Sequence, residues 1–375
     1  MSTSRNKLIE TAKKLDRQSQ MDGDEFYFKK VNEIINDRSD TKKISELYQH
    51  IYILQHVHRR NKITPMLKEL SDTLACYLGY SYISEIFEKE ADKKKNSSLD
   101  ELMNELNQLV GLSKVKEEVR RLVIYQKIQA KRKESGLKVS KRTLHMAFMG
   151  NPGTGKTTVA RIVGRMYYQL GLLSKGHFTE VSRTDLIAGY QGQTALKVKN
   201  VIEKAKGGVL FIDEAYSITE NDNTDSYGRE CLTELTKALE DSRDDLIVIV
   251  AGYTEPMNHF FESNPGLRSR FNYFINFENY SSTELLDIFE TLARKDDYHI
   301  DDKLKEVLLN YFNEKLESNL INFSNGRFVR NLYENLIMNQ AVRLNQSEDV
   351  NLKELTLLIK DDFCLDENRS SDIDL

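Results

Sequence analysis

Cysteine is scarce in this chain of 375 residues, and the three present, Cys76, Cys231 and Cys364, lie far apart without a CxxC pair. That scarcity argues against a disulfide framework and a zinc site, and it favours a reducing compartment. Long apolar runs are also missing, because stretches such as 246–252 fall far short of the roughly 20 residues that a membrane-spanning helix needs. The N-terminus lacks the apolar core of a signal peptide. We therefore expect a cytoplasmic protein with no membrane span.

An excess of charge of one sign is absent as well. Lysine and arginine total 54 residues against 58 aspartates and glutamates, which gives a net charge of −4. This near balance argues against a protein that coats nucleic acid. Charged residues make up 30% of the chain and hydrophobic residues 39%, which is typical of soluble folded proteins. The length suffices for two or three compact units.

Residues 1–95 have a polar, helical pattern. Apolar residues from Ile44 to Val57 recur at helical spacing, and Thr64-Pro65 places a proline where another helix would begin. The charged stretch 88–98 that follows is typical of a boundary between domains. We therefore predict an N-terminal all-α domain over residues 1–95.

From residue 99 to residue 280, short apolar runs alternate with helical segments. Runs bounded by polar turns predict buried strands at 144–149, 177–181, 209–212, 246–251 and 274–277. Helical patterns separate these runs, at 156–170, 195–206, 227–240 and 255–261. Alternation of this kind is typical of a parallel sheet that is covered by helices on both faces.

After Tyr280 the strand-like runs stop. Four helical segments are predicted, at 285–292, 304–316, 328–344 and 352–359. We therefore expect a small helical domain over 281–362, followed by an acidic tail over 363–375.

The sharpest motif is GNPGTGKT at 150–157, which matches GxxxxGK[ST] between a predicted strand and a predicted helix. Its glycines let backbone N–H groups turn toward phosphate oxygens, and the helix N-terminus adds positive potential. Lys156 would reach the β- and γ-phosphates, while the Thr157 hydroxyl would ligate Mg²⁺. The predicted nucleotide-binding residues here are Gly150, Asn151, Pro152, Gly153, Thr154, Gly155, Lys156, Thr157 and Thr158.

A second motif lies about 55 residues further on, where the predicted strand 209–212 ends in Asp213-Glu214. Asp213 would hold the hydrated Mg²⁺, and Glu214 would polarise the water that attacks the γ-phosphate. Two consecutive acids distinguish an ATPase from P-loop GTPases, which usually place a glycine after the aspartate. The pair of motifs therefore predicts hydrolysis of ATP, with Mg²⁺ as cofactor.

These motifs and their order resemble the CbxX/CfqX family of AAA+ ATPases. The family contains the CbbX-type rubisco activases, stage V sporulation protein K and the C-terminal ATPase of EccA. The resemblance spans about residues 100–345 and is carried by MAFMGNPGTGKTTVAR, DLIAGYQGQTA, GGVLFIDEAYS, VIVAGY and NPGLRSRF. It implies an α/β P-loop AAA+ core, with a parallel five-stranded sheet between helices, and a C-terminal helical lid over 281–362.

The resemblance implies roles for further residues around the nucleotide. Val110 and Gly111 fall in the segment that packs against adenine in this superfamily, and Thr254 falls near the sensor-1 position. Arg327 resembles sensor 2, a lid arginine that contacts the phosphates, and Arg330 is a competing candidate for that role.

Three residues are implied to act outside their own pocket. Arg268 and Arg270 fall where the family places an arginine finger, which acts across a subunit boundary; Arg270 is preferred, and two solvated arginines are the alternative. Tyr190, in the glycine-flanked sequence 189–192, falls at the pore loop that grips a polypeptide. A tyrosine that packs on its own domain is the alternative. The resemblance also implies a hexameric ring.

The favoured hypothesis is an ATP-driven ring motor that remodels or threads a protein client through a central pore. A nucleic-acid-associated motor or loader is one alternative, although the acidic C-terminus argues against it. A nucleotide-gated scaffold is another, which the intact Glu214 and the two arginines argue against. We expect the N-terminal domain to select the partner, because it lies outside the ATPase motifs. The client itself is not identified by the sequence.

Overall fold

The computed structural model describes residues 2–18, 25–38, 40–57, 64–79, 82–83, 97–139, 142–190, 193–219, 226–262, 264–318, 323–345 and 351–363. The chain divides into two compact units, Met1–Asn96 and Ser97–Leu375. The predicted acidic tail lies outside the described residues except for Phe363. No helix in the described ranges is long and apolar enough to cross a membrane.

The first unit is all-helical in its described part, as the periodicity of residues 1–95 predicts. Its helices are α1 (Ser2–Gln18), α2 (Phe26–Asn36), α3 (Thr41–Val57) and α4 (Thr64–Leu78). Helix α1 packs against both α2 and α4, and α3 packs against α4. Fully buried leucines such as Leu8, Leu15, Leu67 and Leu70 form its core. This unit therefore has its own hydrophobic core.

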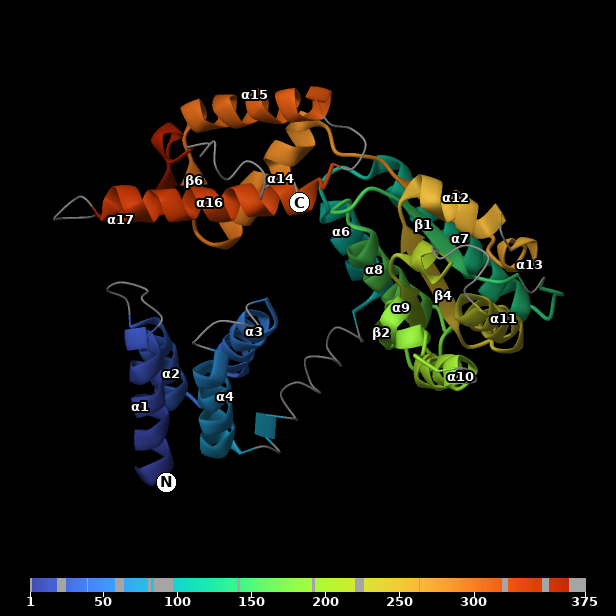
Figure 1. The fold of residues 1–375 in the computed structure, drawn as a ribbon, viewed down its shortest axis with the longest axis horizontal. Coiled ribbons are helices and arrows are strands. Elements are labelled where there is room, and N and C mark those ends of the chain that lie inside the picture. The colour runs from blue at the N-terminus through green and yellow to red at the C-terminus, as the bar shows by residue number, and fades with distance from the viewer. Residues whose placement is uncertain are drawn as a thin grey trace. The chain divides into compact units, whose positions relative to one another are not determined.

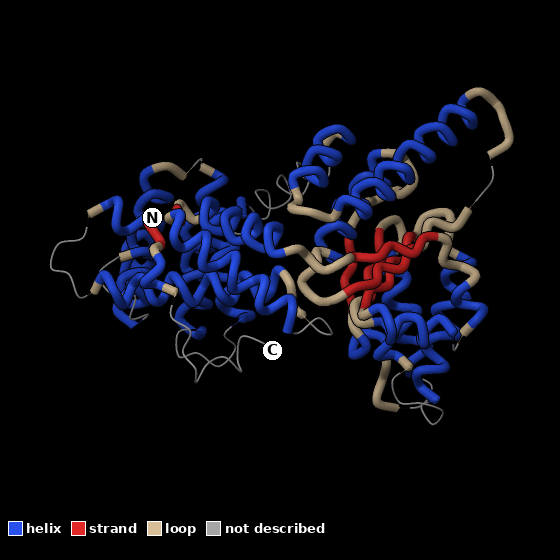
Figure 2. The backbone as a smooth tube through the Cα atoms, turned by 90° about the horizontal axis from the view of Figure 1, so that it is seen from above, coloured by secondary structure: helices blue, strands red, loops and turns tan. Residues whose placement is uncertain are grey.

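The second unit contains a five-stranded parallel sheet in the order β2-β3-β4-β1-β5 (Figures 1 and 2). The strands are β1 (Met146–Gly150), β2 (Phe178–Val181), β3 (Val209–Ile212), β4 (Ile247–Gly252) and β5 (Tyr273–Phe277). Each lies within two residues of a predicted strand, so the sequence prediction of the sheet is confirmed.

Helices cover both faces of this sheet, as the tube view shows (Figure 2). One layer is built by α6 (Leu99–Gln108), α7 (Ser113–Glu134) and α8 (Lys156–Gln169). The other contains α9 (Arg183–Leu186), α10 (Gln193–Ala205), η1 (Ala215–Ile218), α11 (Ser226–Asp241), α12 (Thr254–Glu262) and α13 (Pro265–Arg268).

Alternation along the strands separates the two layers. In β1, Phe148 packs into the layer with α8, whereas its neighbours Ala147 and Met149 pack into the layer with α11. Strand β4 behaves in the same way, because Ile249 faces the first layer and Val250 the second. Both faces of each strand are therefore buried, which explains why the strands appear in the sequence as continuous apolar runs.

The C-terminal helical domain contains α14 (Ser282–Lys295), α15 (Asp302–Ser318), α16 (Gly326–Leu344), α17 (Leu352–Thr356) and η2 (Lys360–Asp362). The expectation that strands stop after Tyr280 is wrong in one detail. A two-residue parallel pair, β6 (His299–Ile300) with β7 (Leu357–Leu358), closes this domain. The helix predicted at 352–359 ends at Thr356, because Leu358 is fully buried and its carbonyl accepts a hydrogen bond from the Asp301 amide. A short apolar run does not distinguish helix from strand by periodicity.

Candidate nucleotide-binding site

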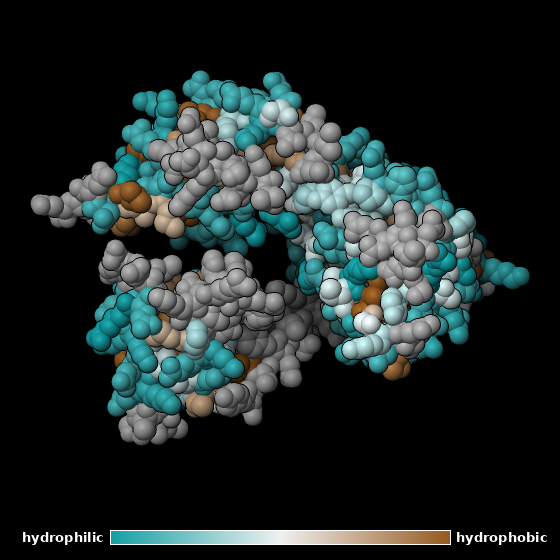
Figure 3. Space-filling model, viewed as in Figure 1, coloured by the Kyte–Doolittle hydropathy of each residue, from teal (hydrophilic) through white to brown (hydrophobic). Residues whose placement is uncertain are grey.

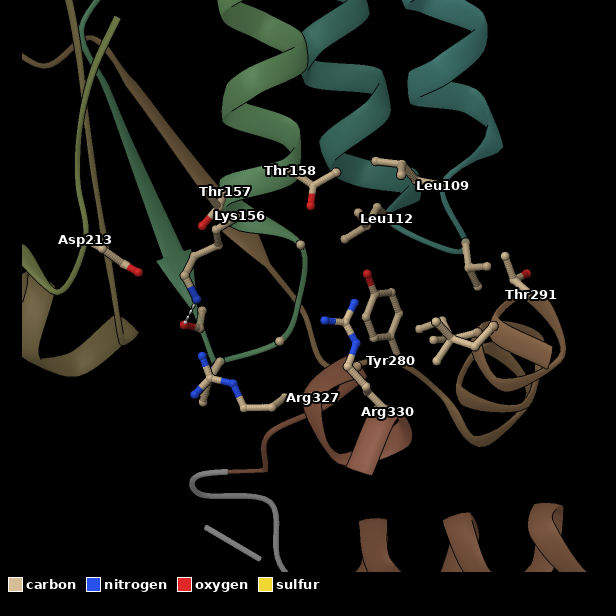
Figure 4. Close-up of a pocket in the computed structure, with 18 of the residues that line it drawn as sticks. Leu109, Leu112, Lys156, Thr157, Thr158, Asp213, Tyr280, Thr291, Arg327 and Arg330 are labelled. Atoms are coloured by element: carbon tan, nitrogen blue, oxygen red, sulfur yellow. Dashed lines mark hydrogen bonds between the residues drawn. The ribbon is translucent and has the colours of Figure 1, made fainter. Parts of the chain in front are cut away.

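A pocket of about 610 Å³ opens at the carboxyl edge of the sheet (Figure 4). Its walls come from the α6–α7 connection, the loop between β1 and α8, the ends of β3 and β4, and the helical domain. Crevices beyond the carboxyl ends of parallel strands are the usual ligand sites of open α/β sheets.

The loop after β1 curls because its glycines adopt left-handed backbone angles. Gly153 has φ +69° and Gly155 has φ +90°, so the chain turns sharply before α8 begins at Lys156. Such angles are accessible to glycine at little cost. The N-terminus of α8 consequently faces the pocket, with the partial positive charge that favours phosphate.

Lys156 is the most perturbed cation at the pocket. Its ammonium group donates hydrogen bonds to the carbonyl oxygens of Gly150 (2.8 Å) and Asn151 (2.7 Å). The pKa of Lys156 is lowered to about 8, mainly by burial; the carboxylates of Asp213 and Glu214 oppose this shift, and the Arg327 guanidinium adds to it. The net lowering of its pKa shows that these groups do not fully compensate the buried ammonium, so an anion in this pocket would stabilise its charged form.

Oxygen ligands suited to a small divalent cation line the same end of the pocket. They are the Thr157 hydroxyl and the carboxylates of Asp213 and Glu214. Asp213 follows β3 directly, and its Oδ1 accepts a hydrogen bond from the Glu214 amide at 3.0 Å, while Glu214 has φ +47°. Hard oxygen donors with room for water and phosphate fit Mg²⁺.

The opposite end of the pocket is apolar and fits a flat ring. Leu109, Val110 and Leu112 line it from the α6–α7 connection, and Ile288 and Leu292 line it from α14. Figure 4 shows Tyr280 standing between this apolar end and the phosphate-binding loop. An adenine base would bury its faces against these side chains.

Close contacts hold the α6–α7 connection in place. Gly111 does not line the pocket; it has φ +59°, and a Cβ there would lie 2.3 Å from Glu284 Oε1. The Lys116 ammonium donates to the carbonyl oxygens of Leu109 and, at 3.2 Å, Asn107. The positive φ favours glycine at this position, so Gly111 shapes the base-binding wall without lining the pocket.

The helical domain supplies two arginines to the pocket. Arg327 and Arg330 both project from the start of α16 toward the phosphate-binding loop (Figure 4). Both sequence candidates for a phosphate-contacting arginine therefore line the site. Arg327 lies closer to Lys156 in this view, and the pKa of Lys156 responds to it.

Comparison with known proteins agrees with this geometry. A model of the ATPase family associated with various cellular activities (AAA) matches residues 146–279, and an AAA lid domain model matches residues 281–373. Stage V sporulation protein K of Bacillus subtilis is 40% identical over 285 residues, which is 75% of this chain and 87% of that protein. The chain belongs to the AAA ATPase family.

Two further relatives cover a similar span. Protein CfxQ of Xanthobacter flavus is 42% identical over 253 residues, 67% of this chain and 79% of that protein. The chloroplastic ribulose bisphosphate carboxylase/oxygenase activase of Cyanidioschyzon merolae is 40% identical over 251 residues, 67% of this chain and 85% of that protein. The helical domain of this AAA ATPase is therefore its lid, and the protein is a nucleotide-binding ATPase.

Some predicted nucleotide-binding residues of this ATPase point away from the pocket. The Thr154 side chain is fully buried and donates to the Asn151 carbonyl at 2.8 Å, and the Asn151 amide donates to Asn279 Oδ1 at 2.9 Å. Thr254 begins α12 with an exposed side chain, whereas its neighbour Tyr253 lines the pocket. Thr154 and Asn151 thus brace the loop.

Neither candidate arginine finger lines its own chain's pocket. Arg268 is exposed, with its guanidinium 4.7 Å from the centre of the Phe274 ring. Arg270 is half-buried, donates to the Gly266 carbonyl at 2.5 Å and lies 3.6 Å from a Glu240 carboxylate oxygen. Both positions stay predictions, and the structure presents Arg268 more openly than the preferred Arg270.

Tyr190 is 74% exposed, and its backbone carbonyl accepts a hydrogen bond from the Gln193 amide at 3.3 Å. Tyr280, by contrast, is a pocket residue that sequence reasoning missed. Its hydroxyl donates to the Thr154 carbonyl at 3.2 Å, and burial raises the pKa of Tyr280 to about 12. Its place directly after the last strand, at the joint with the lid, is the signal that could have found it.

Proposed function

We propose that this AAA ATPase works as a head-to-tail ring that couples ATP hydrolysis to remodelling of a protein client. The observation that supports it most strongly is the separation of two sets of residues. The pocket contains a lysine, a hydroxyl and two acids around the phosphate end, yet Arg268 and Arg270 lie outside it. A neighbouring copy would supply one of these arginines, and a heterologous contact that closes into a ring is the arrangement that does so for every copy.

The chemistry follows from the positions of the chain's own groups. The loop amides and Lys156 bind the phosphates, Thr157 and Asp213 hold the metal, and Glu214 accepts a proton from the attacking water. Mg²⁺, when bound, offsets the negative charge of the β- and γ-phosphates. The incoming arginine would stabilise charge that develops on the γ-phosphate.

Tyr190 is the candidate contact for the client. Its side chain is 74% exposed, and an aromatic ring can grip varied sequences without specific hydrogen bonds. Motion of the lid against the core during turnover would displace this loop. A protein client is also consistent with the relative that is named an activase of another enzyme. The coloured part of the face shown in Figure 3 is mostly hydrophilic, with apolar residues in small separate spots.

The ring is tested by mixing two inactive variants. Glu214→Gln removes the acid of each pocket, and Arg268→Ala removes the arginine that each copy offers to its neighbour. If the arginine acts in trans, an equal mixture restores turnover at about one interface in four, because an intact pocket then meets an intact arginine. Recovery with Arg270→Ala in place of Arg268→Ala would assign the finger to Arg270. No recovery with either arginine variant would exclude a trans site.

The client function is tested with the Glu214→Gln variant as a trap. This variant should bind ATP and hydrolyse it poorly, so a client stays attached long enough for identification after affinity capture from native cells. Client capture should disappear in Glu214→Gln/Tyr190→Ala. It should persist in Glu214→Gln/Tyr190→Phe, which keeps the aromatic side chain at position 190. Capture of nuclease-sensitive complexes that survive Tyr190→Ala would instead support a nucleic-acid motor.

A further inference from the structure

Three asparagine side chains meet where the phosphate-binding loop, the segment after β5 and the start of α16 converge. The Asn279 amide oxygen accepts hydrogen bonds from Asn151 Nδ2 at 2.9 Å and from Asn325 Nδ2 at 3.0 Å. Asn325 Nδ2 also lies 3.3 Å from the Pro152 carbonyl and 2.8 Å from the Phe323 carbonyl. This amide cluster (Asn151, Asn279 and Asn325) joins core to lid beside the pocket, and Asn325 has no role in the site as described so far.

Asn325 is the centre of the amide cluster. Asn325 is fully buried, and its Oδ1 accepts a hydrogen bond from the backbone N–H of Tyr280 at 3.0 Å. The carbonyls of Pro152 and Phe323 can only accept, so the amide nitrogen must face them and the orientation of the side chain follows from chemistry. Every polar atom of this buried side chain is therefore satisfied, by partners on three separate segments.

The backbone of Asn325 is held in a conformation that asparagine rarely adopts. It has φ +47° and ψ −120°, a region that normally belongs to glycine, so the surrounding contacts must hold the residue there. The next residue uses that bend directly, because the Gly326 amide donates to the Gly153 carbonyl at 3.1 Å. A glycine at position 325 would avoid the strain, so the amide side chain is what an asparagine adds here.

We propose that Asn325 is a positioning residue that fixes the start of α16 on the phosphate-binding loop and thereby aims Arg327 at the phosphates. Arg327 follows Gly326 in the first turn of α16, so its direction depends on how that turn is anchored. Asn279 is the shared acceptor that ties Asn325 to the loop through Asn151. The proposal rests on ATP binding at this pocket, as in the proposed function.

A buried amide that only stabilises the fold predicts something different. Its loss would lower stability and affect turnover by the same factor whether or not Arg327 is present. A residue that acts through Arg327 loses its effect once Arg327 is gone. A double-mutant cycle of Asn325→Gly with Arg327→Ala separates the two, and glycine accommodates the backbone angles of position 325 without strain.

The full-length protein and its variants are measured for kcat and for the ratio of the dissociation constants of ADP and a non-hydrolysable ATP analogue. Asn325→Gly should lower kcat about tenfold and reduce the preference for the triphosphate, with no further loss when it is added to Arg327→Ala. Asn279→Ala should reproduce this effect with the backbone of position 325 unchanged. Asn351→Ala is the control: it removes an exposed amide that caps another lid helix, α17, through the Glu354 amide, and should leave both readouts within about twofold.

The proposal is overturned if the factors by which Asn325→Gly and Arg327→Ala lower kcat multiply in the double variant. It is also overturned if Asn279→Ala leaves both readouts as unchanged as Asn351→Ala does. A wild-type protein that binds both nucleotides and hydrolyses nothing would contradict the proposed function instead. In that case the cycle measured on the triphosphate preference still decides the role of Asn325.

Discussion

The nucleotide pocket and the surface that carries Tyr190 and Arg268 are built in different ways. Pocket residues come from the core and the lid, and the loop that binds phosphate is braced by hydrogen bonds through Lys156, Thr154 and Asn151. Tyr190 and Arg268 are exposed and lie outside the pocket. One copy therefore contains what binding needs, whereas the proposed turnover and client contact need a second molecule.

That difference separates two kinds of variant. Substitutions in the pocket should change nucleotide affinity in every molecule, independent of assembly. Substitutions on the exposed set should leave affinity intact and change turnover or capture.

The largest effect is expected from the exposed arginines. Arg268→Ala should lower kcat by about 10³-fold or more, the scale on which arginine fingers act, while the dissociation constant for ADP changes by less than about twofold. Arg270→Ala should have the smaller effect on kcat, because Arg270 already binds the Gly266 carbonyl and lies near Glu240. Steady-state ATPase assays and ADP titrations measure both. A larger loss of kcat in Arg270→Ala than in Arg268→Ala would assign the arginine finger to Arg270. A large loss of ADP affinity in either variant would show that the arginine contacts the nucleotide of its own chain.

A substitution within the pocket should break binding in a different way. A Cβ on Gly153 would lie 2.1 Å from the Ser324 carbonyl and 2.7 Å from the Arg327 amide, so Gly153→Ala must push the lid from the loop. We expect nucleotide affinity to fall about tenfold or more.

Gly171→Ala is the matched control, since Gly171 has φ +70° with nothing within 4 Å of its Cβ position. It carries a similar backbone strain without the clash. Isothermal titration and thermal unfolding of both variants separate the two costs, and equal losses of affinity would show that contact between loop and lid is irrelevant.

Alkaline pH should weaken binding through Lys156. Burial sets the pKa of this lysine at about 8 without nucleotide, and bound phosphates would raise it, so ADP binding takes up a proton above pH 8. Affinity should fall about fivefold from pH 8 to pH 9. The free energy of unfolding, measured without added nucleotide, should instead rise from pH 8 toward pH 10.5. In this range Lys156 binds more protons in the unfolded chain than in the folded one, because its pKa is lower in the folded chain. The Lys156→Arg variant is the control, because its side chain stays charged across this pH range. If its ADP affinity still falls between pH 8 and pH 9, another group causes the pH dependence.

The smallest effect on hydrolysis is expected from removal of the first unit. Its helices have their own core, so deletion of residues 1–96 should leave kcat within about twofold. Capture of a client by the Glu214→Gln trap should nevertheless be lost if this unit selects the partner. Undiminished capture by the truncated trap would assign partner choice to the ATPase unit.

Much of the site was predictable because its chemistry is local in sequence. A strand, a glycine-rich turn and a helix place residues 150–158 on one loop, and an apolar strand places Asp213 at the carboxyl edge. The base-binding wall was predictable only through resemblance, which found Val110. Its partners Ile288, Thr291 and Leu292 look like ordinary core positions of an amphipathic helix.

The sequence by itself determined the sheet, the phosphate-binding loop and the acid pair, since each depends on short-range backbone geometry and on apolar periodicity. Only the tertiary structure decided how the lid meets the loop, which joins Asn151 to Asn279 across 128 positions and Pro152 to Asn325 across 173. The tertiary structure also decided that Tyr253 lines the pocket, where the sequence led us to expect Thr254. It further decided that Arg268 is more exposed to solvent than Arg270. Such outcomes depend on side-chain packing between distant segments, which leaves no periodic trace in the sequence.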